Sequence, residues 1–339
     1  MVGPDNQIMF LAIDAGGTST RAVVIDSAGR GHGYGRAGSG NPTAVGIREA
    51  VNGIGSAAEQ ALAGLAGSAR PALGLVAMAG EKTADFREQV ADRLAAFGVG
   101  QVVLDHDLLG IFHSGTAARD GYALIAGTGT VAARIRAGRL DRVAGGKGWL
   151  LGDAGGGFWI GHAVARAVVA SLDRQGPDTA LTGLVLKAVG IDADRSTPTG
   201  RAEILRELVS ALYARPPISL AELAPLAFAA HEDPVARPIL IAASAALANL
   251  LSAIWAPDLA GPIVVGGGVL VRGLLTAPLS LRTELVPLVA GDHVIPVSDG
   301  LVGAAVLVLR HTAREVDETF FRTIQAEVSR LSGGGQPSQ

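Results

Sequence analysis

The sequence predicts an α/β protein of two related domains, and three observations lead to this prediction. Residues 10–13 form an apolar run of strand length, Gly16 and Gly17 give a turn signal, and residues 22–25 resume with β-branched side chains. Residues 122–135 repeat this plan around a Gly-Thr-Gly-Thr turn. Short apolar runs then alternate with longer segments of helical spacing, which is typical of an α/β fold.

The first half of the chain predicts three strands followed by alternating helices and strands. Thr43 has a hydroxyl that can cap the first of these helices. Strands are expected at residues 10–13, 22–25, 31–35, 72–78 and 101–104, and helices at residues 45–65, 84–97 and 108–118.

The second half is expected to begin near the turn signal Asp120-Gly121. Residues 239–256 hold no charged side chain and approach membrane-spanning length, but they are rich in Ala and lack a strongly basic flank. We therefore expect a buried core helix there. Strands are expected at residues 122–125, 131–136, 140–143, 263–265 and 293–296, and helices up to residue 172, within most of 173–238, and at 279–288, 301–310 and 313–331.

Charge and cysteine content exclude several functional classes. The 339 residues have a formal net charge of -3, and aromatic residues are 4%, so neither nucleic-acid binding nor attraction to an anionic membrane is indicated. The absence of cysteine excludes structural disulfides, zinc–thiolate sites and iron–sulfur ligation. The N-terminal region shows no secretory signal pattern, so we expect a cytoplasmic protein.

Both glycine turns have the chemistry of an anion cradle. Without a Cβ atom, Gly16 and Gly17 allow backbone N–H groups to approach a phosphate closely, and Thr18 adds a hydroxyl donor. Asp14 ends the preceding strand, where a carboxylate can hold Mg²⁺ through water. Neither turn matches a P-loop or leads into a helix as a dinucleotide fold requires, and an ordinary hairpin turn is the alternative for each.

These turns, together with residues 263–270, resemble the phosphate-1, phosphate-2 and adenosine motifs of the actin, hexokinase and heat-shock ATPase superfamily. Residues 148–161 resemble the N-acetylglucosamine kinase branch, which is grouped with the BadF/BadG/BcrA/BcrD ATPases. The resemblance covers about residues 9–310. It implies two ribonuclease H-like (actin/hexokinase-like ATPase) domains with a central cleft, which bind ATP, Mg²⁺ and a sugar.

The resemblance also implies a domain division and a set of nucleotide contacts. The N-terminal domain would span residues 1–118 and the C-terminal domain residues 119–312. A helix at 313–331 would return to the N-terminal domain, and the tail at 332–339 would be disordered. The implied nucleotide contacts are Gly16, Gly17, Thr18, Gly127, Thr128, Gly129, Gly266, Gly267 and Gly268, with Mg²⁺ held at Asp14.

The catalytic base is expected in Asp105-His106-Asp107, which follows the strand at 101–104. A sugar hydroxyl needs a base to accept its proton. The family's pattern is Asn-Asp before a helix, so aligning on the helix places the base at Asp107 and leaves Asp105 as the alternative. Asp107 could also cap that helix. His106 stands where Asn is usual and could bind the sugar, tune Asp107 or fill a polar position.

Three further residues are implied to contact the sugar. Asp153 matches a family Asp that accepts hydrogen bonds from sugar hydroxyls, and the alternative is a helix cap before Phe158. Asn41 matches a family Asn, although Asn before Pro is also an ordinary turn residue. Gly148 lies in the same kinase-like motif as Asp153.

The chain departs from the family pattern beside this motif. Lys147 stands where Trp is frequent, and it could favour an anionic group or lie in a solvated loop. Ala154, Gly155 and Gly156 replace the usual Glu-Gly-Ser, which leaves the exact sugar open. Asp299 is expected to cap the following helix, whose small residues 303–305 would allow close helix packing.

The resemblance thus implies ATP-dependent phosphorylation of N-acetylglucosamine or glucosamine at the 6-hydroxyl. The partner would be a small-molecule sugar, with no nucleic acid or membrane, and family members often form homodimers. The alternatives are an ATPase that drives a conformational change in a partner protein and a non-catalytic sugar or nucleotide sensor. Known activators of the first kind ligate an iron–sulfur cluster through cysteines, and the related ROK proteins carry a Cys-rich zinc motif; this chain has no cysteine.

Overall fold

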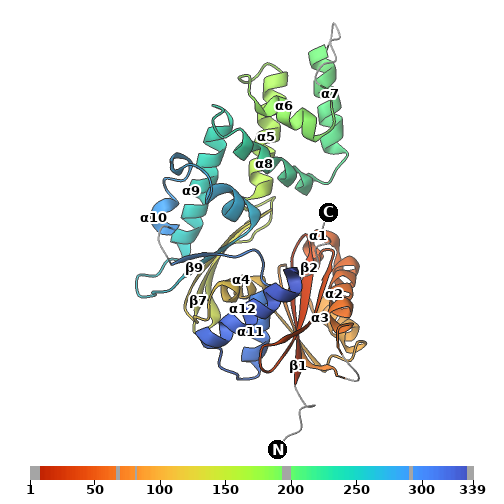
Figure 1. The fold of residues 1–339 in the computed structure, drawn as a ribbon. Helices are drawn as coiled ribbons and strands as arrows, with labels where there is room; N and C mark the ends of the chain where they lie inside the picture. The colour runs from red at the N-terminus through yellow and green to blue at the C-terminus, as the bar shows by residue number, and fades with distance from the viewer. Residues whose placement is uncertain (1–7, 66–68, 81, 193–199, 290–292, 334–339) are drawn as a thin grey trace, which may run out of the picture. The chain divides into compact units, whose positions relative to one another are not determined.

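The computed structural model describes residues 8–65, 69–80, 82–192, 200–289 and 293–333 (Figure 1). The chain divides into two compact units. The first comprises residues 1–123, 135–140 and 297–339, and the second comprises residues 124–134 and 141–296. Most of the predicted leader and tail, residues 1–7 and 334–339, lies outside the described residues.

The first unit is built on a five-stranded sheet in the order β3-β2-β1-β4-β5. β1 (Met9–Ala15) pairs antiparallel with β2 (Thr20–Asp26), which pairs antiparallel with β3 (Gly31–Ala37). On the other side, β1 pairs in parallel with β4 (Pro71–Met78), and β4 pairs in parallel with β5 (Gln101–His106). The carboxyl ends of β1, β4 and β5 therefore lie at one edge of the sheet, where α/β proteins usually bind ligands.

Helices cover both faces of this sheet. α2 and α3, orange in Figure 1, lie on one side of β1 and β2, and α11, in blue, lies on the other. α4 packs beside α11, while α12 contacts α11 and β3. The helices of the first unit are α1 (Pro42–Val45), α2 (Ile47–Leu62), α3 (Ala84–Ala95), α4 (Asp107–Gly115), α11 (Leu301–His311) and α12 (Glu318–Gly333).

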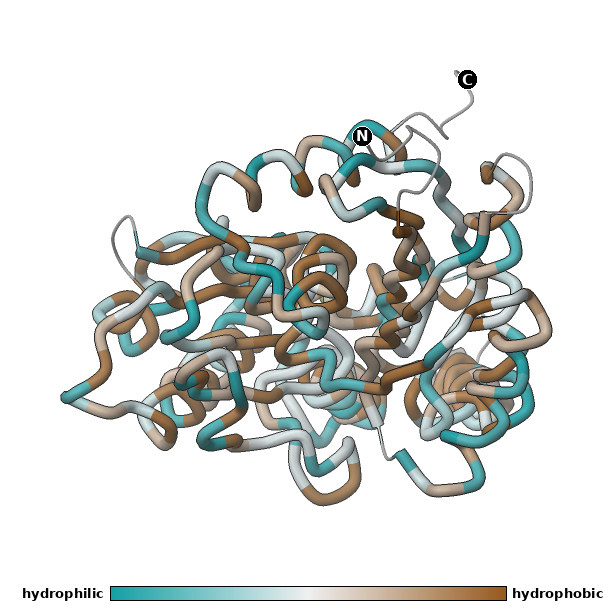
Figure 2. The backbone as a smooth tube through the Cα atoms, turned by 90° about the horizontal axis from the view of Figure 1, so that it is seen from below, coloured by the Kyte–Doolittle hydropathy of each residue, from teal (hydrophilic) through white to brown (hydrophobic). Residues whose placement is uncertain are grey.

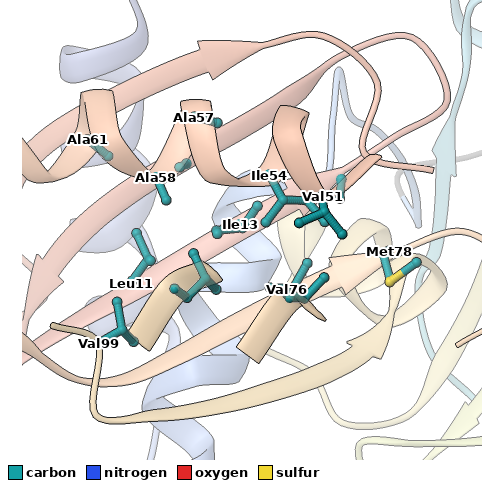
Figure 3. Close-up of a cluster of buried hydrophobic side chains, with 14 of the residues drawn as sticks. Leu11, Ile13, Val51, Ile54, Ala57, Ala58, Ala61, Val76, Met78 and Val99 are labelled. Carbon is teal, nitrogen blue, oxygen red and sulfur yellow. The ribbon is translucent and has the colours of Figure 1, made fainter. Parts of the chain in front are cut away.

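A buried apolar cluster joins the sheet to α2. Leu11 and Ile13 of β1 lie beneath Ile54 of α2, and Val76 and Met78 of β4 extend the cluster (Figure 3). Burying side chains of this size stabilises a fold by about 1.5–3 kcal/mol each. Because neighbouring strand residues face opposite sides, these contacts direct the intervening residues of β1 towards α11.

The second unit, which holds most residues of the second sheet, repeats the strand order of the first. Its sheet runs β10-β9-β6-β7-β8. Counted along the chain, the first strand of each sheet (β1 or β6) therefore lies between the second (β2 or β7) and the fourth (β4 or β9). In both sheets the fourth and fifth strands are parallel. This repetition confirms the predicted α/β protein of two related halves. The strands are β6 (Gly121–Ala126), β7 (Thr130–Arg136), β8 (Arg139–Gly145), β9 (Ile263–Gly266) and β10 (Val294–Pro296).

The helices of the second unit pack mainly through α5, which contacts α6, α7, α8, α9 and η1. Apolar and polar stretches alternate along the described part of the chain, as the change between brown and teal in Figure 2 shows. The helical segments are α5 (Gly157–Leu172), α6 (Leu181–Ala188), α7 (Gly200–Tyr213), η1 (Pro217–Leu223), α8 (Ala224–Ala229), α9 (Ala236–Ile254), η2 (Val269–Leu274), η3 (Leu279–Leu281) and α10 (Val286–Val289).

Among the described helices, α9 is long and apolar enough to cross a membrane by length and composition. One face of α9, including Leu240, Leu247 and Leu251, is buried, and the helix contacts α5 and α8. These contacts are those of a core helix, as the sequence predicts.

Several predicted boundaries are wrong. The helix expected at residues 45–65 is interrupted at Gly46, which adopts a φ of 82° and separates α1 from α2. The helix expected at 279–288 is two short segments, η3 and α10. The helix expected at 313–331 runs from Glu318 to Gly333, so it includes the start of the predicted tail.

α11 lies unusually close to α4. A Cβ atom on Gly303 would overlap the carbonyl oxygen of Gly110, and the Gly303 N–H donates to Ser114 Oγ at 2.8 Å. The small residues at 303–305 thus allow the close helix packing that the sequence predicts. In the structure, α11 belongs to the first compact unit. The domain division that the family resemblance implies places these residues in the C-terminal domain, 119–312.

Candidate functional site

In the first unit, strand register brings the acidic candidates to one edge of the sheet. Asp14 lies opposite Ala77 of β4, and Ala77 lies opposite Asp105 of β5. Asp107 follows two residues later as the first residue of α4. Three carboxylates far apart in sequence therefore project from the carboxyl ends of parallel strands, within one unit.

The first glycine turn (residues 16–18) joins β1 to β2. The Gly16 N–H donates to Ser19 O at 3.1 Å and closes the turn, while Gly17 and Thr18 are exposed. Gly16 O accepts hydrogen bonds from the Gly40 N–H at 3.1 Å and from Ser39 Oγ at 3.2 Å. Ser39 and Gly40, which follow β3, therefore hold the turn at Gly16, while Gly17 and Thr18 at its tip stay exposed.

Asp14 is buried beside the N-terminus of α11. The Gly300 N–H donates to Asp14 Oδ2 at 3.1 Å, and Arg21 Nη1 lies 3.9 Å from the same oxygen. Arg21 Nε lies 3.6 Å from Asp299 Oδ2. Burial, followed by the charge of Asp299, raises the pKa of Asp14 to about 7, although Gly300 and Arg21 oppose this shift.

The donor set around Asp14 suits Mg²⁺ bound largely by a nucleotide. Mg²⁺ prefers oxygen ligands, keeps several waters and often uses one or two carboxylates together with phosphates. Among the described residues, no group of three His, Asp or Glu side chains could hold a metal by itself. Asp14 therefore fits the water-mediated role that the resemblance implies, and it does not form a metal cage.

Asp107 and Asp105 differ in their surroundings. Asp107 Oδ1 accepts the Leu108 N–H at 2.9 Å. Burial raises the pKa of Asp107, although Leu108, Lys82 and His106 oppose this shift. Asp105 Oδ1 accepts the His106 N–H at 2.7 Å, and Asp105 Oδ2 lies 3.8 Å from His311 Nε2. The N-cap of α4 is His106, so Asp107 is not the cap residue itself.

Lys82, which sequence reasoning missed, contacts His106. Its Nζ atom lies 3.1 Å from His106 Nδ1. Lys82 follows β4, the strand beside β5, so the pair arises from neighbouring strand ends. The sequence signal that could have found it is a lysine just after a strand adjacent to the expected base.

Asn41 lies between the first glycine turn and the segment after β4. Its Oδ1 accepts the Thr43 N–H at 2.9 Å and caps α1, so the predicted cap at Thr43 is wrong. A Cβ atom on Gly80 would come within 2.6 Å of Asn41 Oδ1, whereas Asn41 Nδ2 is 4.0 Å from the Cβ position of Gly17. The amide nitrogen therefore faces the glycine turn.

In the second unit, the second glycine turn (residues 127–129) is attached to the start of α5. The Gly157 N–H donates to Gly127 O at 2.7 Å, and the Phe158 N–H donates to Thr128 O at 3.0 Å. Two N–H groups that a helix start leaves unpaired are satisfied by this turn. The Thr128 side chain remains exposed.

This attachment explains why residues 155 and 156 are both glycine in this chain. A Cβ atom on Gly156 would lie 2.8 Å from Thr128 O, and one on Gly155 would lie 2.7 Å from Ala243 O of α9. Gly155 also has a φ of 84°. Close backbone packing therefore requires glycine at both positions.

Asp153 lies against the second glycine turn. Its carboxylate accepts backbone N–H groups of Thr130 and Gly148, and its Oδ2 occupies the space that a Cβ atom on Gly129 would need. Asp153 Oδ1 is buried and has no hydrogen-bond partner among the described residues. Burial raises the pKa of Asp153, although the two N–H groups oppose this shift.

The backbone at Asp153 has a φ of 57°, a left-handed conformation that is costly for a residue other than glycine. The N-cap of α5 is Gly156, so the predicted alternative of Asp153 as a helix cap is wrong. A strained residue with an unpartnered buried oxygen is a feature typical of binding sites.

The glycine triplet (residues 266–268) begins at the last residue of β9 and packs on the end of β6. A Cβ atom on Gly267 would overlap the backbone of Ala126, and Gly267 has a φ of 88°. The Gly267 Cα atom lies 4.0 Å from the Cβ position of Gly127. The structure therefore places the triplet beside the second glycine turn, within one unit.

The loop before Asp153 is exposed. Gly148 O accepts the Gly152 N–H at 2.9 Å, and Gly148 has a φ of 79°. Lys147 is exposed, as expected of a solvated loop residue. Trp149 is 40% exposed and lies 5.0 Å from the ring of Phe158, measured between centroids.

The sequence-predicted residues thus form two groups. The first unit brings together Asp14, Gly16, Gly17, Thr18, Asn41, His106 and Asp107 at the carboxyl ends of its strands. The second unit brings together Gly127, Thr128, Gly129, Gly148, Asp153, Gly266, Gly267 and Gly268. Lys82 and Arg21 join the first group, although sequence reasoning did not identify either residue.

Known proteins similar in sequence are amino-sugar kinases. The N-acetyl-D-glucosamine kinase of Dictyostelium discoideum is 29% identical over 157 residues, which cover 44% of this chain and 46% of that protein. The glucosamine kinase GspK of Vibrio cholerae is 27% identical over 202 residues, which cover 58% of this chain and 67% of that protein. The match to the Dictyostelium kinase therefore spans less than half of that relative.

Solved structures share the fold. A protein from Chromobacterium violaceum, provisionally named an N-acetylglucosamine kinase, superposes with a TM-score of 0.67 at 23% identity, covering 89% of this chain and 99% of that one. A ROK family glucokinase from Streptomyces griseus, in complex with glucose and AMPPNP, gives a TM-score of 0.51 at 18% identity, covering 89% and 99%. These structures confirm the predicted actin/hexokinase-like fold class.

A family model supplies the last comparison. The model of the BadF/BadG/BcrA/BcrD ATPase family matches residues 11–308, which include both glycine turns and the glycine triplet. The match extends over most of the 339 residues. The chain therefore belongs to the BadF/BadG/BcrA/BcrD ATPase family.

Proposed function

We propose that this protein is a sugar kinase that transfers the γ-phosphoryl group of ATP to the 6-hydroxyl of an amino sugar. N-acetylglucosamine is the first candidate and glucosamine the second. The observation that carries the proposal is the position of Asp107, a carboxylate at the same strand edge as Asp14 and the first glycine turn. The names of the similar kinases support the same class of acceptor.

Asp107 is the proposed general base. Phosphoryl transfer depends mainly on positioning and charge stabilisation, and a base in hydrogen-bond reach of the acceptor takes its proton. One oxygen of Asp107 accepts a hydrogen bond from the Leu108 N–H, which holds the carboxylate in place. Asp105 accepts the N–H of the next residue in the same way, but its other oxygen lies 3.8 Å from His311 Nε2 of α11, which supports Asp107 over the alternative base.

The glycines are proposed to cradle the nucleotide. In the first unit, the exposed Gly17 and Thr18 would donate to phosphate oxygens, while Gly16, whose N–H closes the turn, would let the backbone approach closely. Thr128 is exposed in the second glycine turn and would donate in the same way. The glycine triplet would accept the adenosine. Bound Mg²⁺ would neutralise charge on the phosphates, and Asp14 would hold it through water.

Asp153, Asn41 and Gly148 are proposed to bind the sugar. Asp153 offers a buried oxygen that lacks a partner among the described residues, and leaving such an atom unpaired costs about 1–3 kcal/mol. A sugar hydroxyl would satisfy it. Asn41 uses its oxygen to cap α1, so its amide nitrogen is the group proposed to donate to the sugar.

ADP release with Mg²⁺ and ATP, measured across a panel of sugars, tests the proposal. The panel holds N-acetylglucosamine, glucosamine, glucose, N-acetylmannosamine and N-acetylmuramic acid, with a control that lacks sugar. Release that depends on one sugar would support the kinase and identify its acceptor. Equal release in every sample would favour an ATPase that acts on a partner protein, and no release would favour a sensor.

The position of transfer needs a separate measurement. Phosphorus–carbon couplings in the NMR spectrum of the product identify the esterified carbon. Coupling to carbon 6 would support the proposal. A product esterified elsewhere would retain the kinase and overturn the predicted position.

A further inference from the structure

The first step of the inference is the position of Lys82. Lys82 lies between β4 and α3, next to Thr83, which caps α3. β4 pairs in parallel with β5, and Met78 at the end of β4 lies opposite His106 at the end of β5. Lys82 and the expected base therefore leave the sheet at the same edge.

The second step is the direction of the hydrogen bond between Lys82 and His106. Lys82 Nζ lies 3.1 Å from His106 Nδ1. An ammonium group only donates, so Nδ1 accepts, and a neutral imidazole must then carry its proton on Nε2. Burial, followed by the charge of Lys82, lowers the pKa of His106, which favours this neutral form.

The third step concerns the charges that face Asp107. Burial raises the pKa of Asp107, and the Leu108 N–H and then the charge of Lys82 oppose this shift. Burial lowers the pKa of Lys82, and the charges of Asp107 and Asp105 oppose that shift. The lysine charge therefore acts on the imidazole and on the carboxylate at once.

We propose that Lys82 is a positioning residue of the acceptor site, whose ammonium group holds His106 in the Nε2–H tautomer and brings a positive charge against the residue that precedes Asp107. This inference rests on the proposed function. The ionised carboxylate takes the hydroxyl proton of the acceptor while the new O–P bond forms. The bond between the γ-phosphorus and the bridging oxygen breaks, and ADP leaves with the electron pair. The Nε2–H of His106 is left as a donor for an acceptor oxygen.

NMR of the ligand-free protein tests the first part of the inference without relying on turnover. Nitrogen-15 spectra of the histidine rings distinguish the two tautomers, and a His106→Gln variant assigns the signal. In the wild type, His106 should titrate as the Nε2–H tautomer. In Lys82→Met, the pKa of His106 should rise by about one unit, because a nearby positive charge is lost. Lys82→Arg should keep the wild-type value.

The pH dependence of kcat/KM tests the second part. Loss of the lysine charge should move the acid limb of the profile to higher pH by about one unit in Lys82→Met, because Asp107 becomes harder to ionise. Lys82→Arg should restore the limb. Lys187→Met, which removes an exposed lysine of α6, is the matched control and should leave the profile unchanged.

The two measurements separate the possible failures. An unchanged His106 titration together with an unchanged acid limb in Lys82→Met would overturn the inference. A wild type that shows no sugar-dependent ADP release would overturn the proposed function, while the NMR titration would still decide the contact between Lys82 and His106. If Lys82→Met does not fold by circular dichroism, Lys82→Gln replaces it, and the same outcomes apply.

Discussion

The guanidinium group of Arg310 on α11 lies 3.1 Å from Nδ1 of the fully buried His113 on α4. A guanidinium group only donates, so the imidazole that faces it must be neutral. Burial, followed by the charge of Arg310, lowers the pKa of His113 to about 3. The pair therefore ties the packing of two helices in the first unit to the protonation state of one side chain.

We expect this pair to make the protein lose stability in mild acid. The unfolded chain binds a proton at His113 near the ordinary pKa of 6.5, whereas the folded chain binds it only near 3. The contribution of neutral His113 to the free energy of unfolding is therefore fully present above pH 6.5. It falls as the pH drops towards 3, by at most about 1.4 kcal/mol per pH unit. His113→Gln should flatten this dependence. Urea unfolding at pH 7, 6 and 5 measures it, with the exposed His293→Gln as control; equal slopes in all three proteins would contradict the prediction.

Asp107→Asn should abolish phosphoryl transfer and leave ATP binding largely intact. The amide cannot accept the proton of the acceptor, so turnover should fall by at least about 10²-fold. Calorimetric titration with a non-hydrolysable ATP analogue measures the retained binding. Asp105→Asn is the matched control. Near-normal turnover in Asp107→Asn, with loss in Asp105→Asn, would move the base to Asp105.

Asp153→Asn should weaken sugar binding more than nucleotide binding. Hydrogen bonds to a charged group contribute about 1.5–3 kcal/mol, so the KM for the sugar should rise by about 10-fold or more. Nucleotide affinity should change by less than about 3-fold, because one amide oxygen can still accept the N–H groups of Thr130 and Gly148. Equal losses for both ligands would instead assign Asp153 to holding the second glycine turn.

Gly303→Ala should destabilise the first unit. The added methyl group would overlap Gly110 O, and the backbone would have to shift, which costs about 1–3 kcal/mol. Gly183→Ala, in the first turn of α6, is the matched control because no atom lies within 4 Å of its Cβ position. It should stabilise the protein by up to about 1 kcal/mol. Thermal unfolding measures both, and an unchanged Gly303→Ala would show that the two helices can separate without cost.

The sequence was sufficient for the features that local pattern encodes. Each strand–turn–strand motif is a continuous stretch, so residues 10–25 and 122–135 predicted both glycine turns, and their repetition predicted two related halves. The helix expected at residues 279–288 was wrong because apolar spacing persists across two short segments that the backbone breaks into separate turns. Apolar periodicity alone does not report such breaks.

The contacts that complete the first unit were not predictable from the sequence. Lys82 meets His106 because the sheet aligns the ends of β4 and β5, and Arg21 meets Asp299 because α11 packs against the sheet. The close backbone packing at Gly155 and Gly156 could not be predicted from the sequence either, since it depends on the carbonyl oxygens of Ala243 and Thr128. Residues whose role depends on partners far along the chain need the fold before they can be interpreted.

The attachment of α5 to the second glycine turn bears on how homologous sequences should be interpreted. Gly155 and Gly156 are required by backbone packing in this chain, so selection for a folded second unit would retain them whether or not the protein phosphorylates a sugar. Asp107 is the proposed general base, so its retention or loss in a homologue would bear on catalysis and not on the packing of the second unit.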